Sequence, residues 1–371
     1  MIIELAMAGG LAAGAAAMAR PRLLPAARTA PTPPSNGITV VIPARNAATT
    51  IAPLLVSLQR RGSRATEVIV VDDASQDATA HLAAAHGARV LSIEGDPPAG
   101  WTGKSYACHR GAAVASGRLL LFLDADVTLR AEALDRLVAA HAEHGGLISV
   151  QPYHQTRRPY EALSAVCNVV AIMGTGAFAM WRMRRPAAFG PCLLTSADDY
   201  RRAGGHVAVR GEVVEDVALA RRFDSIGLPV SIFAGWRAVD FRMYPDGPRQ
   251  LAEGWTKNLA SGAGLVDPVA AAISVWWVSA CIAATATALR LVAGHGPHGV
   301  FAALACWAVV AVELRWMWRR VGSFGWWAAV LYPIAIVAFV VLFVRSAWAT
   351  VIRRRVRWSG RPIAITGRRA G

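Results

Sequence analysis

The order of hydrophobic and polar residues divides the chain into a strand–helix region and several long apolar runs. Between residues 38 and 151, short apolar runs alternate with segments whose apolar residues follow a helical spacing. This pattern predicts strands at 38–42, 67–71, 89–93, 118–123 and 147–151. It predicts helices at 47–61, 78–86 and 105–116. Because strands that alternate with helices form a parallel sheet covered by helices on both faces, we expect an α/β fold.

A long apolar run also begins the sequence. Residues 1–19 are about enough to cross the ~30 Å hydrocarbon core of a membrane. A cleaved signal peptide is the rival interpretation, but no basic residue precedes the run. Arg20 and Arg22 follow it, which predicts that the next domain lies in the cytoplasm. Prolines and small polar residues at 31–37 then predict a linker.

Three more apolar runs lie near the other end, at 269–292, 299–314 and 325–352. Tryptophans gather in and beside these runs, as interfacial anchors do. One N-terminal and three C-terminal spans would place the arginines of 353–357 outside the cell, against the positive-inside rule. We therefore expect that one run is interfacial or re-entrant, or that the last run does not cross fully.

A separate apolar stretch lies at 161–181, interrupted by Gly174 and Gly176 and followed by Arg182 and Arg184. Its composition predicts a helix in or against the bilayer surface. A buried core helix is the alternative.

The distribution of charge separates a membrane protein from a nucleic-acid-binding one. The 371 residues carry a net charge of +15, with 54% hydrophobic and 17% charged residues, which excludes a disordered chain. A basic total first suggests nucleic acid. However, residues 315–371 hold eleven Arg and no Lys, Asp or Glu, residues 1–29 carry +2, and residues 30–314 carry only +2. Since the charge flanks the apolar runs, we expect a multi-pass plasma-membrane protein with no nucleic-acid partner.

Polar residues follow three of the predicted strands. These residues are Pro43, Arg45 and Asn46 after the first strand, Asp72 and Asp73 after the second, and Asp124 and Asp126 after the fourth. Ligands bind at the carboxyl ends of the strands in open parallel sheets, so we expect a site there. The sequence has neither GxGxxG after the first strand nor a Walker A segment, and its cysteines show no zinc or disulfide spacing. A dinucleotide site and a P-loop are therefore excluded.

The sequence Asp-Ala-Asp at 124–126 is the first candidate for chemistry. Two acids that flank one residue on extended backbone point to the same side. One carboxylate can bind Mg²⁺ or Mn²⁺ bridged to a diphosphate, while the other meets a sugar hydroxyl. A loop or cap acid explains most isolated cases, but the position after a buried strand favours a site.

Two other acidic pairs each have two interpretations. Asp72 and Asp73 precede a predicted helix, so they can cap it, bind a base or ribose, or do both. Glu215 and Asp216 open an apolar helical run, where acids complement the helix dipole. A carboxylate beside a sugar acceptor would instead be a general base.

Only two residues of the chain are lysines. Lys104 and Lys257 end similar segments, GWTGK at 100–104 and GWTK at 254–257. A compact ammonium suits a phosphate group as a point charge. A solvated surface lysine is the alternative at both positions.

Together these segments resemble the family 2 glycosyltransferases, which have the GT-A fold, over roughly residues 37–265. Residues 40–46 (VVIPARN) resemble the family's opening strand and turn, and 70–79 (VVDDASQDAT) its VVDDxSxDxT phrase. Residues 124–126 match its DxD sequence, and 215–216 match its later acidic pair. The resemblance implies a nucleotide-sugar-binding Rossmann-like half at 37–130 and an acceptor-binding, catalytic half at 131–265. Around them we expect a transmembrane anchor at 1–20, a C-terminal transmembrane region at 269–352 and a basic tail at 353–371.

The resemblance also implies roles on the donor side. Asp72 or Asp73 would hold the donor base, with Pro43, Arg45 and Asn46 contributing to the donor site. Asp124 would contact the ribose or sugar, and Asp126 would bind the divalent metal. Lys104 would neutralise the departing nucleoside diphosphate.

On the acceptor side, the resemblance implies an inverting reaction. Asp216 would be the catalytic base, with Glu215 supporting it. Trp255 and Lys257 would lie near the acceptor and the membrane.

Four shorter segments, 100–104 (GWTGK), 203–206 (AGGH), 253–258 (EGWTKN) and 357–361 (RWSGR), resemble the membrane enzymes that glycosylate carotenoid acids, of the diaponeurosporenoate type, and hopanoid-associated relatives. The QxxRW sequence of processive synthases is not matched, since Gln250 is followed by Leu-Ala-Glu-Gly-Trp. We therefore expect transfer of a single sugar, from UDP-glucose, to a lipid such as a carotenoid acid or hopanoid. The alternatives are a polyprenyl-phosphate sugar transferase and a non-catalytic membrane protein that keeps the fold.

Overall fold

The computed structural model describes residues 2–27, 37–59, 65–181, 185–212, 214–262, 266–294, 296–350, 355–358 and 361–364. The chain forms two compact units that are interleaved in sequence. The sheet unit comprises Arg22–Tyr153 and Arg185–Arg242, and the helical unit comprises Met1–Pro21, His154–Arg184 and Met243–Gly371. The predicted division at 130/131 falls inside the sheet unit. The predicted linker at 31–36, Arg182, Arg184 and most of the basic tail lie outside the described residues.

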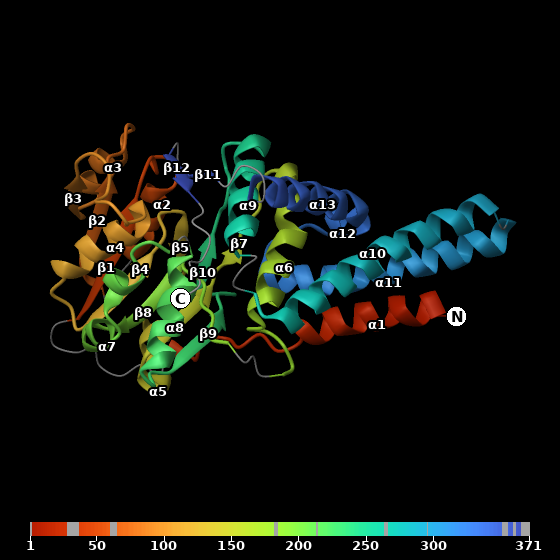
Figure 1. The fold of residues 1–371 in the computed structure, drawn as a ribbon, viewed down its shortest axis with the longest axis horizontal. Helices are drawn as coiled ribbons and strands as arrows, with labels where there is room; N and C mark the ends of the chain where they lie inside the picture. Colours follow the sequence, from red (N-terminus) through yellow and green to blue (C-terminus); the bar gives the residue numbers. More distant parts are fainter. Residues whose placement is uncertain are drawn as a thin grey trace. The chain divides into compact units, whose positions relative to one another are not determined.

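A seven-stranded mixed sheet forms the sheet unit, in the order β3-β2-β1-β4-β8-β6-β9 (Figure 1). Its strands are β1 (Ile38–Ala44), β2 (Ala65–Asp73), β3 (Arg89–Ile93), β4 (Leu119–Leu123), β6 (Leu147–Gln151), β8 (Cys192–Ser196) and β9 (Val230–Ala234). The helices of this unit are α2 (Ile51–Leu58), α3 (Thr79–Ala85), α4 (Gly103–Ala113), α5 (Ala133–His144), α7 (Ala197–Arg202), the 3-10 helix η3 (Gly205–Val209) and α8 (Glu215–Ser225). Two short strands, β5 (Val127–Leu129) and β10 (Val239–Phe241), pair antiparallel beside it, and β7 (Tyr153–His154) ends the first stretch of the unit.

The predicted α/β alternation is confirmed from β1 to β6, but the sheet is not wholly parallel. Strand β8 pairs antiparallel with both β4 and β6. No strand was predicted at 192–196, because this five-residue run stands outside the strand–helix repeat. The predicted helix at 47–61 is shorter than expected and covers Ile51–Leu58 among the described residues.

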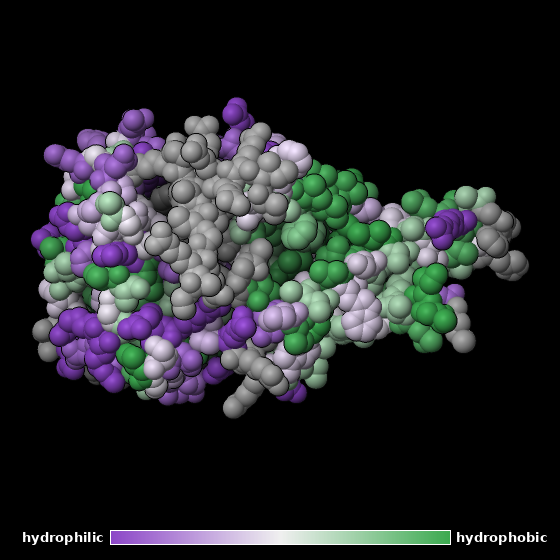
Figure 2. Space-filling view, in the orientation of Figure 1, coloured by the Kyte–Doolittle hydropathy of each residue, from purple (hydrophilic) through white to green (hydrophobic). Residues whose placement is uncertain are grey.

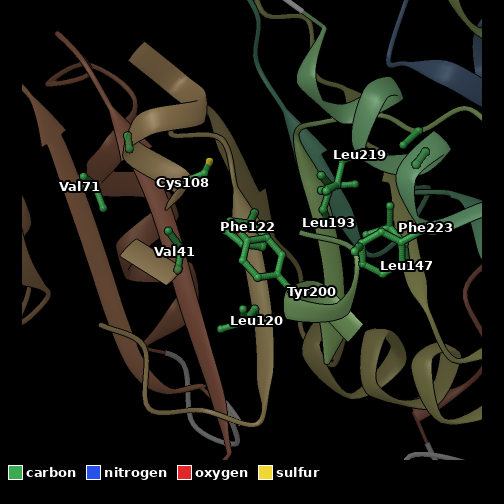
Figure 3. Close-up of a cluster of buried hydrophobic side chains, with 14 of the residues drawn as sticks. Val41, Val71, Cys108, Leu120, Phe122, Leu147, Leu193, Tyr200, Leu219 and Phe223 are labelled. Carbon is green, nitrogen blue, oxygen red and sulfur yellow. The ribbon is translucent and has the colours of Figure 1, made fainter. Parts of the chain in front are cut away.

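The core of the sheet unit follows from the alternation of side chains along each strand. Ile69 and Val71 on β2, and Leu120 and Phe122 on β4, point to the same face and join one buried cluster (Figure 3). Gly111 of α4 lets that helix approach the sheet, because a Cβ at this position would collide with the side chain of Val41. Close packing of α4 fixes where its first turn stands at the sheet edge.

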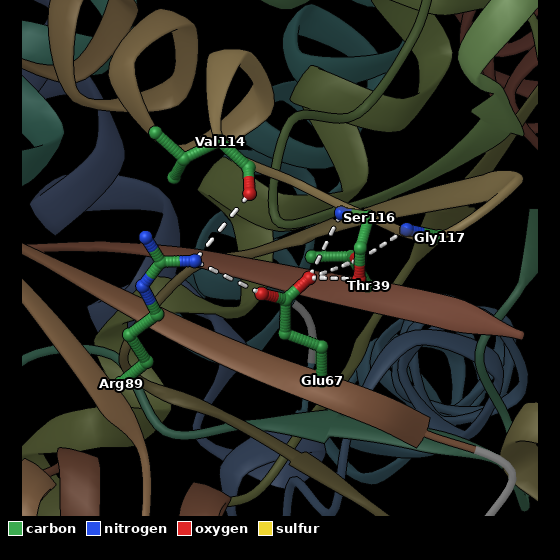
Figure 4. A network of polar contacts seen from close by, with 6 residues as sticks. All are labelled: Thr39, Glu67, Arg89, Val114, Ser116 and Gly117. Carbon is green, nitrogen blue, oxygen red and sulfur yellow. Dashed lines mark hydrogen bonds and ion pairs between the residues drawn. The ribbon is translucent and has the colours of Figure 1, made fainter. Parts of the chain in front are cut away.

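Near the amino-terminal ends of the strands, one carboxylate, that of Glu67 on β2, connects several neighbouring elements (Figure 4). Its Oε2 accepts hydrogen bonds from Thr39 Oγ1 at 2.7 Å and from the Ser116 N–H at 3.0 Å. Its Oε1 pairs with Arg89 Nη1 at 3.3 Å. Burial raises the pKa of Glu67, but these hydrogen bonds outweigh it, so the pKa lies below its usual value. The contact joins β1, β2, β3 and the turn before β4.

The helical unit consists of α1 (Ile2–Ala17), η2 (Pro159–Leu163), α6 (Ser164–Thr175), α9 (Pro248–Gly262), α10 (Pro268–Gly294), α11 (Gly296–Val321), α12 (Trp326–Val330) and α13 (Tyr332–Trp348). Strands β11 (Arg355–Trp358) and β12 (Arg361–Ala364) form a separate hairpin. Within the described residues, Pro268–Ala293 and Gly299–Val321 are long and apolar enough to cross a membrane. Apolar residues gather on the surface of these helices in Figure 2.

Helix α1 packs against α10 through small residues. A Cβ at Gly14 would collide with the ring of Trp277, and one at Gly10 would meet Ala280 Cβ at 2.7 Å. Trp276 Nε1 also donates to the Ala6 carbonyl oxygen at 2.8 Å. With 16 residues, α1 is shorter than the two candidate spans.

Two predictions for the apolar runs change with the structure. Helix α6 is buried over most of its length, which favours the core-helix alternative for 161–181 over a helix on the bilayer surface. The last run, 325–352, is not one continuous helix, because Leu331 separates α12 from α13 and Pro333 stands in the first turn of α13.

Candidate active site

The ammonium group of Lys104 contacts the acidic residues that follow β4 and begin α8. Lys104 lies in the first turn of α4, whose N-cap is Thr102. Its Nζ lies 2.7 Å from Asp124 Oδ1 and 3.0 Å from Glu215 Oε1. Asp124 directly follows β4 and Glu215 begins α8, so Lys104 connects two segments that are 91 positions apart.

Asp216, beside Glu215, is oriented by two backbone groups. The Gly190 N–H donates to Asp216 Oδ2 at 2.6 Å, and the Val217 N–H donates to Oδ1 at 2.9 Å. The next residue after Gly190 also contacts the site, since the Pro191 carbonyl oxygen accepts from the Asp124 N–H at 3.0 Å. The backbone of residues 190–191 therefore contacts both Asp124 and Asp216.

Sequence reasoning missed Gly190. A Cβ at this position would lie 2.9 Å from Asp216 Oδ2, which is closer than side-chain atoms approach one another. The Gly-Pro pair just before a short apolar run was the available signal, because such pairs mark turns at strand ends.

Burial and mutual repulsion perturb the acids of the site. Burial, reinforced by the Glu215 carboxylate, raises the pKa of Asp216 to about 6. Burial, reinforced by Asp124, raises the pKa of Asp126 to about 7. Burial alone would lower the pKa of Lys104, but Asp124 and Glu215 outweigh it and the pKa lies well above its usual value. The lysine is therefore charged, and both raised acids exchange protons near neutral pH.

Asp126 is the residue best suited to hold a divalent cation. Its carboxylate forms no ion pair within the part of the chain that the structure describes, while Lys104 is already bound to Asp124 and Glu215. A cation would offset the repulsion between Asp124 and Asp126 that raises the Asp126 pKa. No group of three or more His, Cys, Asp or Glu among the described residues forms a complete metal site.

The ends of β1 and β2 place the other predicted donor residues. Pro43 lies in β1, and Arg45 Nη1 donates to the Asp73 carbonyl oxygen at 2.6 Å. Asn46 Oδ1 accepts from the Gln76 N–H at 2.8 Å. These hydrogen bonds connect the loop after β1 to the loop after β2. Arg45 and Asn46 therefore help to fix the conformation of both loops.

Asp72 differs from its neighbour in its hydrogen bonding. Asp73 pairs with Arg45, at 3.9 Å between Oδ2 and Nη1. Asp72 Oδ1 is buried and accepts no hydrogen bond from the described residues. Since buried acceptors are normally satisfied, Asp72 is the member of the pair with capacity for a ligand.

No role was predicted for His206, which is a buried histidine close enough to Lys104 to be affected by its charge. Burial, with a contribution from the nearby Lys104, lowers the pKa of His206 to about 3. Its Nδ1 lies 2.8 Å from Tyr200 Oη, and the Tyr200 hydroxyl oxygen accepts from the His206 N–H at 3.0 Å. Both rings pack against Phe122 of β4, so this pair supports the strand that delivers Asp124.

The two remaining predicted site residues, Trp255 and Lys257, lie on α9 of the helical unit. Trp255 is buried, and its Nε1 donates to Ser164 Oγ at 2.9 Å. Its ring packs edge-on against Tyr244. The indole therefore serves the packing of the helical unit, and an acceptor-contacting role for either residue stays a prediction.

Comparison with known proteins identifies the family. The family model for glycosyl transferase family 2 matches residues 39–167. The 4,4'-diaponeurosporenoate glycosyltransferase of Staphylococcus aureus strain USA300 is 36% identical over 336 residues, covering 89% of each chain, as is that of strain NCTC 8325 / PS 47. A mannosyltransferase from Pyrobaculum calidifontis, solved in complex with GDP-Man and Mn2+, has a TM-score of 0.56 at 16% identity and covers 95% of this chain and 96% of its own. The fold is that of the GT-A enzymes, as the sequence predicted, and the chain belongs to glycosyltransferase family 2.

Proposed function

We propose that the protein transfers one hexose from a nucleoside diphosphate sugar, UDP-glucose, to the carboxyl group of a carotenoid acid or to a similar apolar lipid. The observation that carries this proposal is the extent of the similarity to 4,4'-diaponeurosporenoate glycosyltransferase. It covers 89% of both chains and so includes helical segments outside the 39–167 stretch that the general family model matches.

In the proposed reaction, Asp216 is the base. The acceptor hydroxyl or carboxylic acid gives its proton to Asp216, and the freed oxygen attacks the anomeric carbon of the donor. The bond from that carbon to the diphosphate oxygen breaks, and its electron pair leaves with the nucleoside diphosphate. Attack opposite to the leaving group inverts the configuration. The raised pKa of Asp216, about 6, suits a group that must accept a proton near neutral pH.

The donor is bound by the edge of the sheet in this proposal. Asp72 accepts a hydrogen bond from the base, and Asp124 contacts the ribose or sugar. Asp126 would hold a divalent cation, Mg²⁺ or Mn²⁺. When bound, such a cation would supply positive charge to offset the charge of the departing diphosphate. Lys104 forms ion pairs with Asp124 and Glu215 and adds positive charge beside the leaving group.

An apolar acceptor explains the helical unit. We propose that α1, α10 and α11 cross the plasma membrane with the sheet unit on the cytoplasmic side. A soluble acceptor would not require an enzyme anchored in the bilayer, whereas an isoprenoid dissolved in the bilayer does. The arginines that follow α1 and end α11 fit the cytoplasmic side.

The experiment that tests the proposal is direct transfer with the full chain in lipid nanodiscs. UDP-glucose and Mn²⁺ are supplied with 4,4'-diaponeurosporenoate, and mass spectrometry should show an acceptor heavier by one hexose. Parallel reactions contain a hopanoid, a polyprenyl phosphate, or GDP-mannose as donor, and Asp216→Asn is the inactive control. Transfer only to the polyprenyl phosphate would establish the alternative transferase. Absence of both transfer and donor hydrolysis with every donor would favour a non-catalytic protein.

A further inference from the structure

The last apolar run of the chain has a geometry that neither a full span nor a buried helix explains. Helix α13 exposes one apolar stripe along its length, consisting of Ile334, Val337, Val341, Val344 and Trp348, each between 57% and 61% exposed. The opposite face is buried within the helical unit and consists of Tyr332, Ala335, Ile336, Phe339, Leu342 and Ser346. The exposed Arg345 lies beside the C-terminal part of this stripe. An exposed apolar stripe of this length marks a surface that contacts an apolar environment.

The last apolar run begins next to residues 154–156, where the chain passes from the sheet unit into the helical unit. Ser323 N–H donates to the His154 carbonyl oxygen at 2.8 Å, and Thr156 N–H donates to Ser323 Oγ at 2.7 Å. Phe324 packs edge-on against the ring of His154. His154 directly follows Tyr153, the last residue of a sheet-unit segment. In the membrane placement proposed above, on which this inference rests, this end of the helical unit is therefore cytoplasmic.

The break between α12 and α13 lies part-way along the two candidate spans. Tyr332 Oη lies 3.0 Å from Thr285 Oγ1 of α10, and its ring packs against Trp307 of α11. Trp307 is 14 residues before the end of α11 at Val321, which is about 21 Å of helix. The turn is therefore well inside the thickness that α10 and α11 would cross.

A turn at that depth requires partners for its backbone. Non-helical backbone is tolerated in the hydrocarbon region only where protein satisfies its polar groups. Here Trp307 Nε1 donates to the Val330 carbonyl oxygen at 2.8 Å, and the Leu331 N–H donates to the Trp327 carbonyl oxygen at 2.9 Å. Tyr332 is fully buried. The turn thus has the protection that a bilayer-embedded break needs.

From this turn, α13 leads back to the end where the run began. Its 17 residues span about 26 Å, enough to return from the depth of the turn to the end where the run began. It packs against α6, η2 and α9, and β11, which follows it, lies beside α9 (Figure 1). Helix α9 carries the exposed Arg249–Glu253 pair, so its surface is in water. Both ends of the run are therefore on one side.

We propose that residues 324–348 form a re-entrant helical hairpin. The hairpin enters the leaflet on the sheet-unit side, turns at Leu331 and returns, and the exposed stripe of α13 contacts the acyl chains of that leaflet. This arrangement keeps the C-terminal arginines, including those of 353–357, on the cytoplasmic face. It resolves the conflict with the positive-inside rule that four full spans would create, and it does not depend on the sugar or the acceptor.

Depth measurement by spin labelling tests the proposal on the full chain in liposomes. Cysteines replace Ile334, Val337, Val341, Val344 and Trp348 one at a time, in a Cys306→Ala background, since the other four native cysteines are buried. Each label's accessibility to oxygen and to a water-soluble nickel complex gives its depth. We expect depth to decrease steadily from 334 to 348. Labels at Val275, Ile282 and Leu289, exposed along α10, should instead be deepest at the middle position.

Two outcomes would overturn the hairpin. One is an α13 profile that is deepest near 341, as in the α10 control. The other is labelling of Ala370→Cys by an impermeant maleimide only from the outside of intact cells. A further pair of variants tests the turn: Trp307→Phe removes the donor to Val330 and should change the depth at 334, whereas Trp326→Phe, on an exposed side chain, should not.

Discussion

Lys104 Nζ and Glu215 Oε1 lie 3.0 Å apart, and this ion pair joins the first turn of α4 to the first residue of α8. The same ammonium lies 2.7 Å from Asp124 Oδ1. The donor-side acid and the acid next to the proposed base are therefore coupled through one charge. The sequence suggested Lys104 as a phosphate contact, and the structure adds that its charge lowers the pKa values of Asp126 and Asp216.

Substitution of Lys104 should impair catalysis in a way that pH reveals. Lys104→Met should lower kcat/KM by about 10²- to 10³-fold, as expected for loss of a preorganised positive group. Because Lys104 lowers the pKa values of Asp126 and Asp216, its removal should move the acidic limb of the rate profile to higher pH. A lower rate with no shift of that limb would indicate a purely structural role. Arg201→Met, at a largely exposed cation, is the matched control.

The pH dependence of the wild-type enzyme should report the base itself. Asp216 has a pKa raised to about 6, so it is protonated and inactive below that pH and ionised above it. We expect kcat/KM to rise as pH increases through about 6. Asp216→Asn should lower the rate by about 10²- to 10⁴-fold and remove this limb. A limb that persists in Asp216→Asn would assign the titration to another group.

Comparison of acceptors sharpens the role of the base. A carboxylic acid ionises far more readily than an alcohol, so it depends less on proton removal by the enzyme. Asp216→Asn should therefore lose more activity with an apolar alcohol than with a carotenoid acid. Parallel kcat measurements with both acceptors check this. Equal losses would mean that Asp216 acts mainly by orienting the acceptor.

The metal should be required for transfer and should depend on Asp126. Removal of divalent ions with EDTA should abolish transfer, and Mn²⁺ or Mg²⁺ should restore it. Asp126→Asn removes one ligand charge, so a higher Mn²⁺ concentration should be needed for half-maximal rate. Isothermal titration of Mn²⁺ with UDP gives an activity-independent readout. Unchanged Mn²⁺ affinity in Asp126→Asn would remove this residue from the proposed metal site.

The sequence predicted the sheet-unit elements with periodic patterns and missed features that depend on distant contacts. β3 and β6 have the predicted bounds because their apolar runs end at Gly, polar or charged residues. The antiparallel strand β8 was missed, since its direction is set by pairing with β4 and β6 rather than by its own residues. Gly190 was missed for the same reason, because its partner Asp216 lies 26 residues away. Asp72, Asp73, Asp124 and Asp126 were found because they end a strand or come just after one, whereas Glu215 and Asp216, which begin α8, were found through the family resemblance.

Glu67 offers a test of stability that is separate from catalysis. It lies near the amino-terminal ends of the strands, whereas the proposed active site lies at their carboxyl ends. Glu67→Gln should destabilise the sheet unit by about 1 kcal/mol, because a partly buried set of charged hydrogen bonds is weakened. Its pKa is lowered on folding, so its stabilisation is present above the unfolded pKa of about 4.3 and is lost as pH falls through the folded value. Wild type and variant should therefore converge in urea midpoint once the pH falls below the folded pKa of Glu67. A constant difference at all pH values would contradict this.

The backbone of Gly190 makes the most specific prediction about the base. Gly190→Ala places a Cβ about 2.9 Å from Asp216 Oδ2, so either the carboxylate or the 190–191 segment must move. Displacement of a catalytic group by about 1 Å can cost on the order of 10²-fold in rate. We expect a loss of that size in kcat, with thermal unfolding changed little, because Gly190 precedes β8 rather than lying within it. Gly227→Ala is the matched control for loss of a glycine, since no atom lies within 4 Å of its Cβ position, although its φ of +75° adds strain. If Gly190→Ala retained full kcat while Gly227→Ala behaved as expected, the contact between Gly190 and Asp216 would not position the base.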